Sequence, residues 1–259
     1  MRAFERFEDA SINFNMGNFF SRSVRMKGCI LLVNDELADD PYLNYATRIR
    51  AGKNARKLIR TVEAFFIARG SRPAFYLTPS TQPGSFRKTL VSLGYVPFCS
   101  DAWMFFDLKK SPMPDKKISV RKITKKELKE FKRVFNEVYT KGEEGDPYAG
   151  LSPLYGKFLV KRFSNRQAEH YAAFLGRKMV GTIVIVHDNK DACLYALAVL
   201  PEFRKMGVCR SLIASCVARA KELEMQNLYL QTEKNSRNEM IFKKLGFITK
   251  FVADGFVRA

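Results

Sequence analysis

The segment from Ala196 to Ile213 limits what this chain can fold into more than any other. An apolar run with strand character ends at Pro201, a short turn carrying Arg204 and Gly207 follows, and an amphipathic helix then begins. A helix that starts directly after a strand presents free backbone N–H groups and the positive end of its dipole at one point. Such a helix start favours binding of a diphosphate. The sequence therefore predicts a phosphate-bearing cofactor, and so an enzyme.

The length of 259 residues, with an apolar fraction of 46%, is enough for two ordinary domains. The segment 109–117 combines two prolines with four lysines and has no periodicity, which is typical of an exposed linker. We therefore expect a domain over 1–108, a linker over 109–117 and a second domain over 118–259.

The chain is strongly basic, with 45 Lys and Arg residues against 26 Asp and Glu residues and a net charge of +19. The densest basic run is 116–133, where only Glu127 and Glu130 oppose nine cations. A field of this sign favours phosphorylated cofactors, nucleic acid or anionic surfaces. A solvated basic face without a partner is the alternative that the composition leaves open.

Cysteine usage and hydropathy exclude several classes of protein. The five cysteines include no C-x-x-C pair, so we expect neither a disulfide framework nor a metal site. The N-terminus has no signal-like apolar core, and no apolar run approaches the roughly 18–20 residues that span a bilayer. We expect a cytoplasmic protein that does not bind membranes.

The second half alternates helices and strands. Thr124 and Glu127 form a capping box for a helix that reaches about Tyr139, and a second helix is expected over 152–163. The remaining elements are strands at 118–122, 169–175, 179–187, 192–200 and 227–232, helices at 208–223 and 235–245, and a closing strand pair at 247–252 and 255–258. The helical crossover from 192–200 to 227–232 predicts one parallel pair in a largely antiparallel sheet.

The first half contains a fainter copy of this plan. Strand 75–78, a helix from about Ser85, Ser92-Leu-Gly-Tyr95 and strand 102–107 parallel the last elements of the second half. An amphipathic helix over 53–69 precedes them, as the helix over 208–223 precedes their counterparts. This repetition predicts two similar domains.

The turn Pro201-Glu-Phe-Arg-Lys-Met-Gly-Val-Cys-Arg-Ser-Leu212 resembles motif A of the GCN5-related N-acetyltransferases, the GNAT family, whose loop reads Arg/Gln-x-x-Gly-x-Gly/Ala. Asn235, followed seven residues later by Phe242-Lys-Lys-Leu-Gly-Phe247, resembles that family's next signature. The resemblance covers about 118–258. It implies an α/β (α+β) protein with two acyl-CoA N-acyltransferase-like domains, the first degenerate. Each would be a mixed, mostly antiparallel sheet flanked by helices, with two splayed parallel strands in the C-terminal one.

The resemblance also implies a site for acetyl-CoA. In the family the acyl-CoA lies where two parallel strands part, which here are 192–200 and 227–232. The residues expected to bind it are Leu197, Ala198 and Val199 on the strand, the loop residues Arg204, Lys205, Met206, Gly207, Val208, Cys209, Arg210 and Ser211, and Asn235. Asn235 has a second interpretation, since it is also placed to cap the helix that follows it.

Two residues depart from the family pattern. Cys209 stands where the loop usually has Gly or Ala. Phe242 stands where many members have a tyrosine that protonates the departing thiolate, and phenylalanine has no proton to donate. The identity of the acid is therefore left open.

Acyl transfer from a thioester to an amine needs a base, a polarised carbonyl and an acid for the thiolate. Glu233, at the end of strand 227–232, is the first candidate for the base, and Glu169 and His170 are further candidates. Tyr195 and Tyr229 are candidates for the acid. Each of these residues has a packing or surface role as its alternative.

The predicted function is transfer of an acetyl group from acetyl-CoA to a primary amine of a small molecule or peptide, without a metal. Two alternatives stay open: a nucleic-acid- or ribosome-associated binding protein with a GNAT-like core, and an aminoacyl-tRNA-dependent transferase. The acidic loop over 143–146 favours a cationic amine or is an ordinary solvated loop. The acceptor, the acyl length and the oligomeric state do not follow from the sequence.

Overall fold

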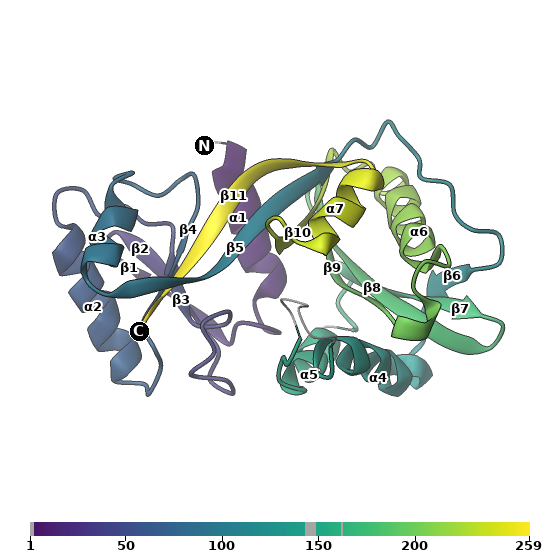
Figure 1. Ribbon diagram of the computed structural model, residues 1–259, viewed down its shortest axis with the longest axis horizontal. Helices are drawn as coiled ribbons and strands as arrows, with labels where there is room; N and C mark the ends of the chain where they lie inside the picture. The colour runs from purple at the N-terminus through teal and green to yellow at the C-terminus, as the bar shows by residue number, and fades with distance from the viewer. Residues whose placement is uncertain (1–2, 143–148, 162) are drawn as a thin grey trace. The chain divides into compact units, whose positions relative to one another are not determined.

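The computed structural model describes residues 3–142, 149–161 and 163–259. The chain divides into two compact units (Figure 1). Unit 1 comprises Met1–Ala102 and Phe251–Ala259, and unit 2 comprises Trp103–Lys250. These boundaries differ from the expected domains 1–108 and 118–259, because a strand at the end of each half of the chain crosses from one unit into the other.

Unit 2 follows the predicted alternation of strands and helices. Its described elements are the end of β5 (Tyr95–Phe106), β6 (Ser119–Lys122), a short 3₁₀ turn at Lys125–Glu127, α4 (Leu128–Tyr139), α5 (Leu154–Lys161), β7 (Ala168–Leu175), β8 (Lys178–Asp188), β9 (Asp191–Val199), α6 (Val208–Glu222), β10 (Asn227–Glu233), α7 (Arg237–Lys244) and the start of β11 (Phe247–Arg258). Thr124 and Glu127 form the predicted capping box.

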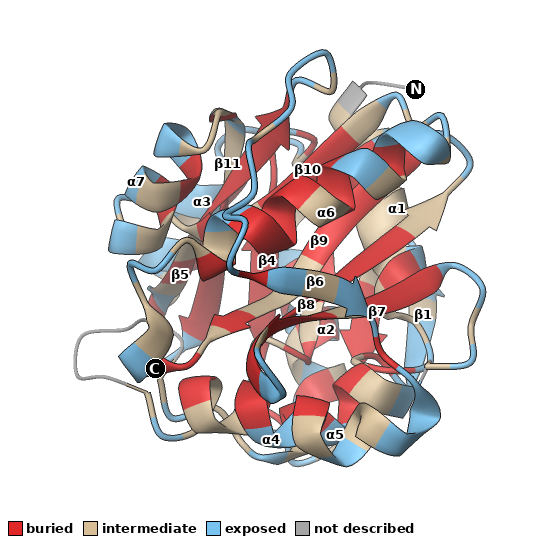
Figure 2. Cartoon of the chain, turned by 90° about the vertical axis from the view of Figure 1, so that its right-hand side faces the viewer, coloured by how far each residue is buried: buried red, intermediate tan, exposed pale blue. Residues whose placement is uncertain are grey.

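The strands of unit 2 lie in the order β5-β10-β9-β8-β7-β6. The pairs from β6 to β9 are antiparallel, and β9 and β10 are parallel because α6 carries the chain from one to the other. Helices α4 and α5 cover one face of the sheet and α6 covers the other (Figures 1 and 2). The predicted parallel pair and mixed sheet are confirmed.

Unit 1 has a plan of the same kind. Its elements are α1 (Ala3–Asn15), β1 (Arg22–Met26), β2 (Cys29–Val33), β3 (Tyr45–Thr47), α2 (Ala55–Ile67), β4 (Ala74–Leu77), α3 (Phe86–Ser92), the start of β5 and the end of β11. The strand order is β1-β2-β3-β4-β11, with β3 and β4 parallel across α2 and the other pairs antiparallel.

The two strand orders show the internal repeat. In unit 1, β1-β2-β3-β4-β11 corresponds to β7-β8-β9-β10-β5 in unit 2, and α2 corresponds to α6. The last strand of each set is supplied by the other half of the chain: Asp254–Val257 pairs with β4, and β5 is the neighbour of β10. The sequence predicted two similar halves but not this exchange of strands.

The C-terminal residues correct one further expectation. Phe247–Arg258 is one continuous strand, β11, and not the pair of strands predicted on either side of Gly255. A Cβ atom at Gly255 would lie 2.5 Å from the Cys99 Sγ and from the Phe98 ring. This glycine therefore permits close packing within a strand and does not mark a turn.

The segment 109–117 is exposed, as predicted for a linker, but it is attached to α6 at two points (Figure 2). Lys221 Nζ donates a hydrogen bond to Ser111 Oγ (2.6 Å) near the end of α6. The Asp115 N–H donates to Ser211 Oγ (2.9 Å) in the first turn of α6. The segment thus runs along the helix from its C-terminal to its N-terminal end.

Candidate functional site

Strands β9 and β10 separate within unit 2. Their parallel register runs through four pairs, from Asn227 opposite Asp191 to Leu230 opposite Leu194. Both strands continue past the last pair, β9 to Val199 and β10 to Glu233. The backbone of β9 beyond Leu194 is therefore not paired with β10, which is the separation expected of the two splayed strands.

A β-bulge in β9 begins where this separation begins. The β8–β9 register shifts between Thr182 and Val184, and Ala196 has a φ of 54°, which costs a non-glycine residue on the order of 1–2 kcal/mol. Side-chain hydroxyls hold the two carbonyls of the bulge. Thr182 Oγ1 donates to Ala196 O (3.1 Å), and the Tyr139 hydroxyl donates to Leu197 O (2.9 Å).

The loop before α6 is the candidate anion-binding loop. Lys205 and Gly207 have positive φ values of 64° and 83°, with Met206 between them. The first hydrogen bond of α6 runs from the Ser211 N–H to Gly207 O (3.0 Å). The N–H groups of residues 208–210 come before that bond and have no acceptor within the helix. They point out of its first turn, at the positive end of the dipole.

Gly207 is required for two reasons. Its φ of 83° disfavours any residue with a side chain, and a Cβ atom there would lie 2.9 Å from the Asp115 Cβ and 3.1 Å from Asp115 Oδ2. Asp115 Oδ1 accepts a hydrogen bond from the Lys117 N–H (2.9 Å), which fixes the carboxylate beside the loop. Asp115, near the end of the linker, thus lies against the candidate anion-binding loop.

The other predicted loop residues divide between surface and core. Arg204 is half-buried and donates from Nε to Val199 O (3.4 Å), while Lys205 and Arg210 are exposed and Met206 is 45% exposed. Val208 and Ser211 are buried and attach the loop to the sheet and to the linker, and Cys209 is half-buried. Burial raises the pKa of the Cys209 thiol to about 12, so this cysteine stays protonated near neutral pH.

Asn235 does not cap α7. Ser236 is the N-cap residue, and its Oγ accepts a hydrogen bond from the Glu239 N–H (3.1 Å). Asn235 is exposed with a φ of 60°, and its backbone N–H donates to Glu239 Oε2 (2.7 Å). Its side chain is therefore not used by the helix end, which removes the capping role as an explanation for this residue.

The three residues proposed for catalysis lie on β9 and β10. Tyr229 is fully buried and stacks on Trp103 and Phe105, with ring centroids 5.7 and 5.4 Å apart. Burial raises the pKa of Tyr229 far above its ordinary value, which is the behaviour of a packing residue. Tyr195 and Glu233 are half-buried at the parts of the strands that separate.

Glu169 and His170 are placed for other roles. The buried Glu169 carboxylate pairs with Arg219 Nη2 (2.8 Å) and accepts from the Tyr171 hydroxyl (2.9 Å). Arg219 is 11 residues beyond the start of α6, about 17 Å along the helix from the anion-binding loop. His170 is 1% exposed between Phe131 and Phe163, with Nε2 3.1 Å from Leu159 O. Both residues support the fold here.

Phe242 is buried and packs on Phe247, with ring centroids 5.8 Å apart. It therefore offers no proton donor near β10. The sequence reasoning missed Tyr139, Thr182 and Asp115, because each acts through a contact between elements distant along the chain. The acidic loop at 143–146 lies outside the described residues.

Residues 129–247 match the model of the acetyltransferase (GNAT) family. Over these residues the chain is similar to the GNAT acetyltransferases. The matched segment contains the β9 bulge, the anion-binding loop and α7. No curated protein matches the sequence.

Several solved structures share the fold of this protein over most of the chain. A GCN5-related N-acetyltransferase from Kribbella flavida has a TM-score of 0.68 at 13% identity and covers 92% of this chain and 89% of its own. A conserved protein of unknown function from Staphylococcus epidermidis has a TM-score of 0.68 at 10% identity, covering 91% and 92%. A tandem GNAT protein from the clavulanic acid biosynthesis pathway has a TM-score of 0.57 at 14% identity, covering 88% and 77%. At such low identities, the TM-scores show a shared fold alone.

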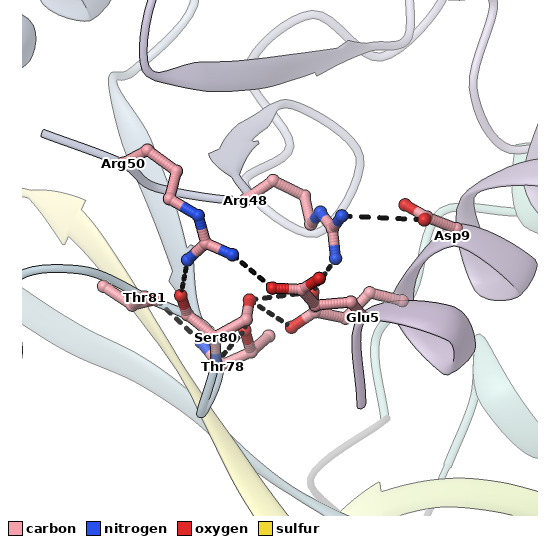
Figure 3. Close-up of polar contacts among 8 residues, drawn as sticks. Glu5, Asp9, Arg48, Arg50, Thr78, Ser80 and Thr81 are labelled. Carbon is pink, nitrogen blue, oxygen red and sulfur yellow. Dashed lines mark hydrogen bonds and ion pairs between the residues drawn. The ribbon is translucent and has the colours of Figure 1, made fainter. Parts of the chain in front are cut away.

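In unit 1, the strands β3 and β4 correspond to β9 and β10 of unit 2. The position just beyond their paired residues is occupied by side chains of the protein itself (Figure 3). β3 and β4 share one backbone pair, Ala46 with Phe75, and the residues that follow both strands meet α1. The buried Glu8 carboxylate accepts one shared hydrogen bond from the Ser80 hydroxyl, whose Oγ lies 2.9 and 2.8 Å from its two oxygens, and pairs with Arg48 Nη1 (2.9 Å).

Arg50, two residues after Arg48, is held in the same way (Figure 3). It pairs with Glu5 and donates to Ser80 O. The two arginines that precede α2 are thus bound to carboxylates of α1. They are not directed at a ligand.

Within the described ranges no group of three His, Cys, Asp or Glu side chains is arranged to hold a metal ion. Over the same residues, no helix has the length and apolar character needed to cross a bilayer.

Proposed function

We propose that this protein is an N-acetyltransferase that moves an acetyl group from acetyl-CoA to a primary amine of a small molecule or peptide. The observation that carries the proposal is the coincidence of two features in unit 2. The β9–β10 register ends at Leu194 and Leu230, and β9 leads directly into a loop whose first helical amides have no intrahelical acceptor. The GNAT match over 129–247 supports the same reaction class.

The loop residues fit the diphosphate of CoA. The amides of residues 208–210 supply donors, Gly207 allows close approach of the backbone, and Lys205 and Arg210 add positive charge at the surface. The backbone of Leu197, Ala198 and Val199 supplies the strand edge for the pantetheine arm. Asn235, whose side chain the helix cap does not need, is proposed as a further contact.

The chemistry follows from what acyl transfer requires. The amine nitrogen bonds to the thioester carbon, the C–S bond breaks, and the leaving thiolate takes a proton while the amine loses one. Backbone amide groups near Val199 are proposed to polarise the carbonyl. Glu233 is proposed as the base and Tyr195 as the acid, because both are half-buried where the strands separate, whereas Tyr229 is fully buried.

Unit 1 is proposed to be a degenerate GNAT-like domain without a second acyl-CoA site. Its β3–α2–β4 crossover corresponds to β9–α6–β10, but Glu8, Arg48 and Ser80 bond to one another where the strands end. A single CoA per chain is therefore expected.

Titration calorimetry with acetyl-CoA, desulfo-CoA and AMP tests the proposal on the full chain. We expect one site per chain for both CoA species and much weaker binding of AMP, which lacks the diphosphate and the pantetheine arm. Arg210→Glu should weaken CoA binding about tenfold, equivalent to 1.4 kcal/mol. Lys129→Glu makes the same charge change on α4, on the opposite face of the sheet, and should leave binding unchanged. Absence of CoA binding by the wild-type protein would refute the proposal.

A further inference from the structure

An exposed basic face in unit 1 has no role in the proposed reaction. It comprises five residues from the turn of the β1–β2 hairpin and from the segment at and just before the start of α2: Lys27, Lys53, Arg56, Lys57 and Arg60. The hairpin turn and the helix start are neighbours, because the Arg50 N–H donates to Gly28 O (2.7 Å) and a Cβ atom at Gly28 would lie 3.6 Å from Leu58 Cδ2. All five residues are exposed.

The four cations at the helix start form a row. Lys53 lies just before the N-cap residue Asn54, and Arg56, Lys57 and Arg60 lie on the exposed side of α2, whereas Leu58, Ile59, Val62 and Phe66 face the core. Asn54, the N-cap residue, makes no side-chain capping bond, and the first turn has no acidic residue. Arg56, Lys57 and Arg60 therefore present positive charge to solvent over about 6 Å of helix.

This charge is not neutralised by the protein. The segment 41–62 contains no Asp or Glu. No ion pair joins any of these five cations to a residue that the structure describes. The basic run at 116–133 differs in this respect, because Arg121 pairs with Glu127 and Arg133 pairs with Glu130.

The arrangement is unfavourable for the helix itself. Cations near a helix N-terminus oppose the helix dipole, and like charges three or four residues apart repel one another. An anionic partner would reverse both effects. The row is thus better suited to a bound state than to the isolated helix.

The composition of the face selects the class of partner. The five side chains that define the face are all cationic, so charge is what it offers a partner. A series of exposed cations suits phosphates, which bind through charge and release counterions. We propose that this basic face of unit 1 docks the sugar-phosphate backbone of a nucleic acid.

Fluorescence anisotropy with a labelled 20-base-pair duplex and the full-length protein tests the proposal. The variant Lys53→Gln/Arg56→Gln/Lys57→Gln/Arg60→Gln is compared with Lys125→Gln/Lys126→Gln/Lys129→Gln/Lys132→Gln. Both sets remove four exposed cations, so net charge falls equally. Binding should weaken at least tenfold in the first variant and less than twofold in the second. The slope of log K against log salt should become less negative by about 0.9 for each phosphate that the variant no longer neutralises.

Two controls keep the outcome decisive. The melting temperature of the α2 variant should equal or exceed that of the wild type, since like-charge repulsion is removed. If that variant is less stable, the single changes Arg56→Gln and Arg60→Gln replace it and should each weaken binding. Equal loss in the α2 and α4 variants, no duplex binding by the wild type, or binding to phosphatidylserine vesicles without duplex binding would each overturn the proposal. CoA binding measured in the same samples distinguishes its failure from failure of the acetyltransferase assignment.

Discussion

The Tyr139 hydroxyl donates a hydrogen bond to the carbonyl oxygen of Leu197, at a distance of 2.9 Å. Tyr139 ends α4, and Leu197 follows the strained Ala196 in the bulge of β9. The contact connects a helix on one face of the sheet to the strand edge that is proposed to hold acetyl-CoA. It fixes the direction of the backbone groups beyond the bulge.

Replacing Tyr139 by Phe should therefore lower kcat/KM for acetyl-CoA about fivefold, which corresponds to loss of one hydrogen bond worth about 1 kcal/mol. The ring should stay in place, because it stacks on Phe135 with centroids 4.5 Å apart. Steady-state kinetics measure the effect, and Thr182→Ser, which keeps the neighbouring hydroxyl, is the matched control. An unchanged kcat/KM in Tyr139→Phe would contradict a positioning role.

Gly207→Ala should destabilise the protein by about 1–2 kcal/mol and weaken CoA binding, because alanine is strained at a φ of 83° and its Cβ meets Asp115. Urea unfolding and calorimetry measure the two effects. The double variant Gly207→Ala/Asp115→Gly separates the causes. Compared with Gly207→Ala, the double variant should regain the stability that was lost through the side-chain contact with Asp115. It should not regain the stability that was lost through the strained φ. If the changes in unfolding free energy caused by Gly207→Ala and Asp115→Gly simply add in the double variant, the contact between residues 207 and 115 is unimportant.

Stability should decrease as the pH falls below about 6.5. Burial lowers the pKa of both His170 and His187 from the ordinary value of 6.5, so the unfolded chain binds protons that the folded chain does not. The stabilisation is complete above the unfolded pKa and is lost as the pH falls toward the folded values. Urea unfolding between pH 5 and 8 measures this slope. His170→Gln should reduce the slope of unfolding free energy against pH. A slope equal to that of the wild type would assign the pH dependence to other groups.

A second loss of stability is expected in more acidic solution. Although burial opposes it, hydrogen bonds from Arg219 and Tyr171 hold the pKa of Glu169 below its ordinary value of 4.5. Its contribution is present above that value and is lost as the pH falls through the folded pKa. Glu169→Gln should be less stable than the wild type at pH 7 and should approach it at low pH. A difference in unfolding free energy between Glu169→Gln and the wild type that stays the same at every pH would contradict this.

Glu8→Ala should destabilise the protein by about 1–3 kcal/mol, because it leaves Ser80 and Arg48 without their buried acceptor. The number of CoA molecules bound should remain one per chain, since unit 1 is proposed to have no site. Thermal unfolding and calorimetry check both points, and Asp9→Ala, which removes the more exposed partner of Arg48, should cost less. Binding of a second CoA in Glu8→Ala would show that the side chains had masked a functional site.

The internal repeat and the strand–loop–helix conformation before α6 were predictable because they are local in the sequence. Pro201, Arg204 and Gly207 fall within seven residues, and strand, turn and helix signals there follow one another in order. The same holds for the capping box of Thr124 and Glu127, which the structure confirms. Short-range patterns of this kind depend on backbone conformation and hydrogen-bonding capacity, which each residue carries with it.

Other features were decided by tertiary structure. Gly255 looks like a turn until Phe98 and Cys99 pack against it, and Asn235 looks like a helix cap until Ser236 takes that role. The sequence alone determined the order of elements, the parallel crossover and the loop before α6. Tertiary structure decided which strand completes each unit, that Tyr139 and Asp115 reach the site, and that Glu8 fills the corresponding position in unit 1. Those outcomes depend on contacts between residues far apart along the chain, whose energies appear only once packing brings them together.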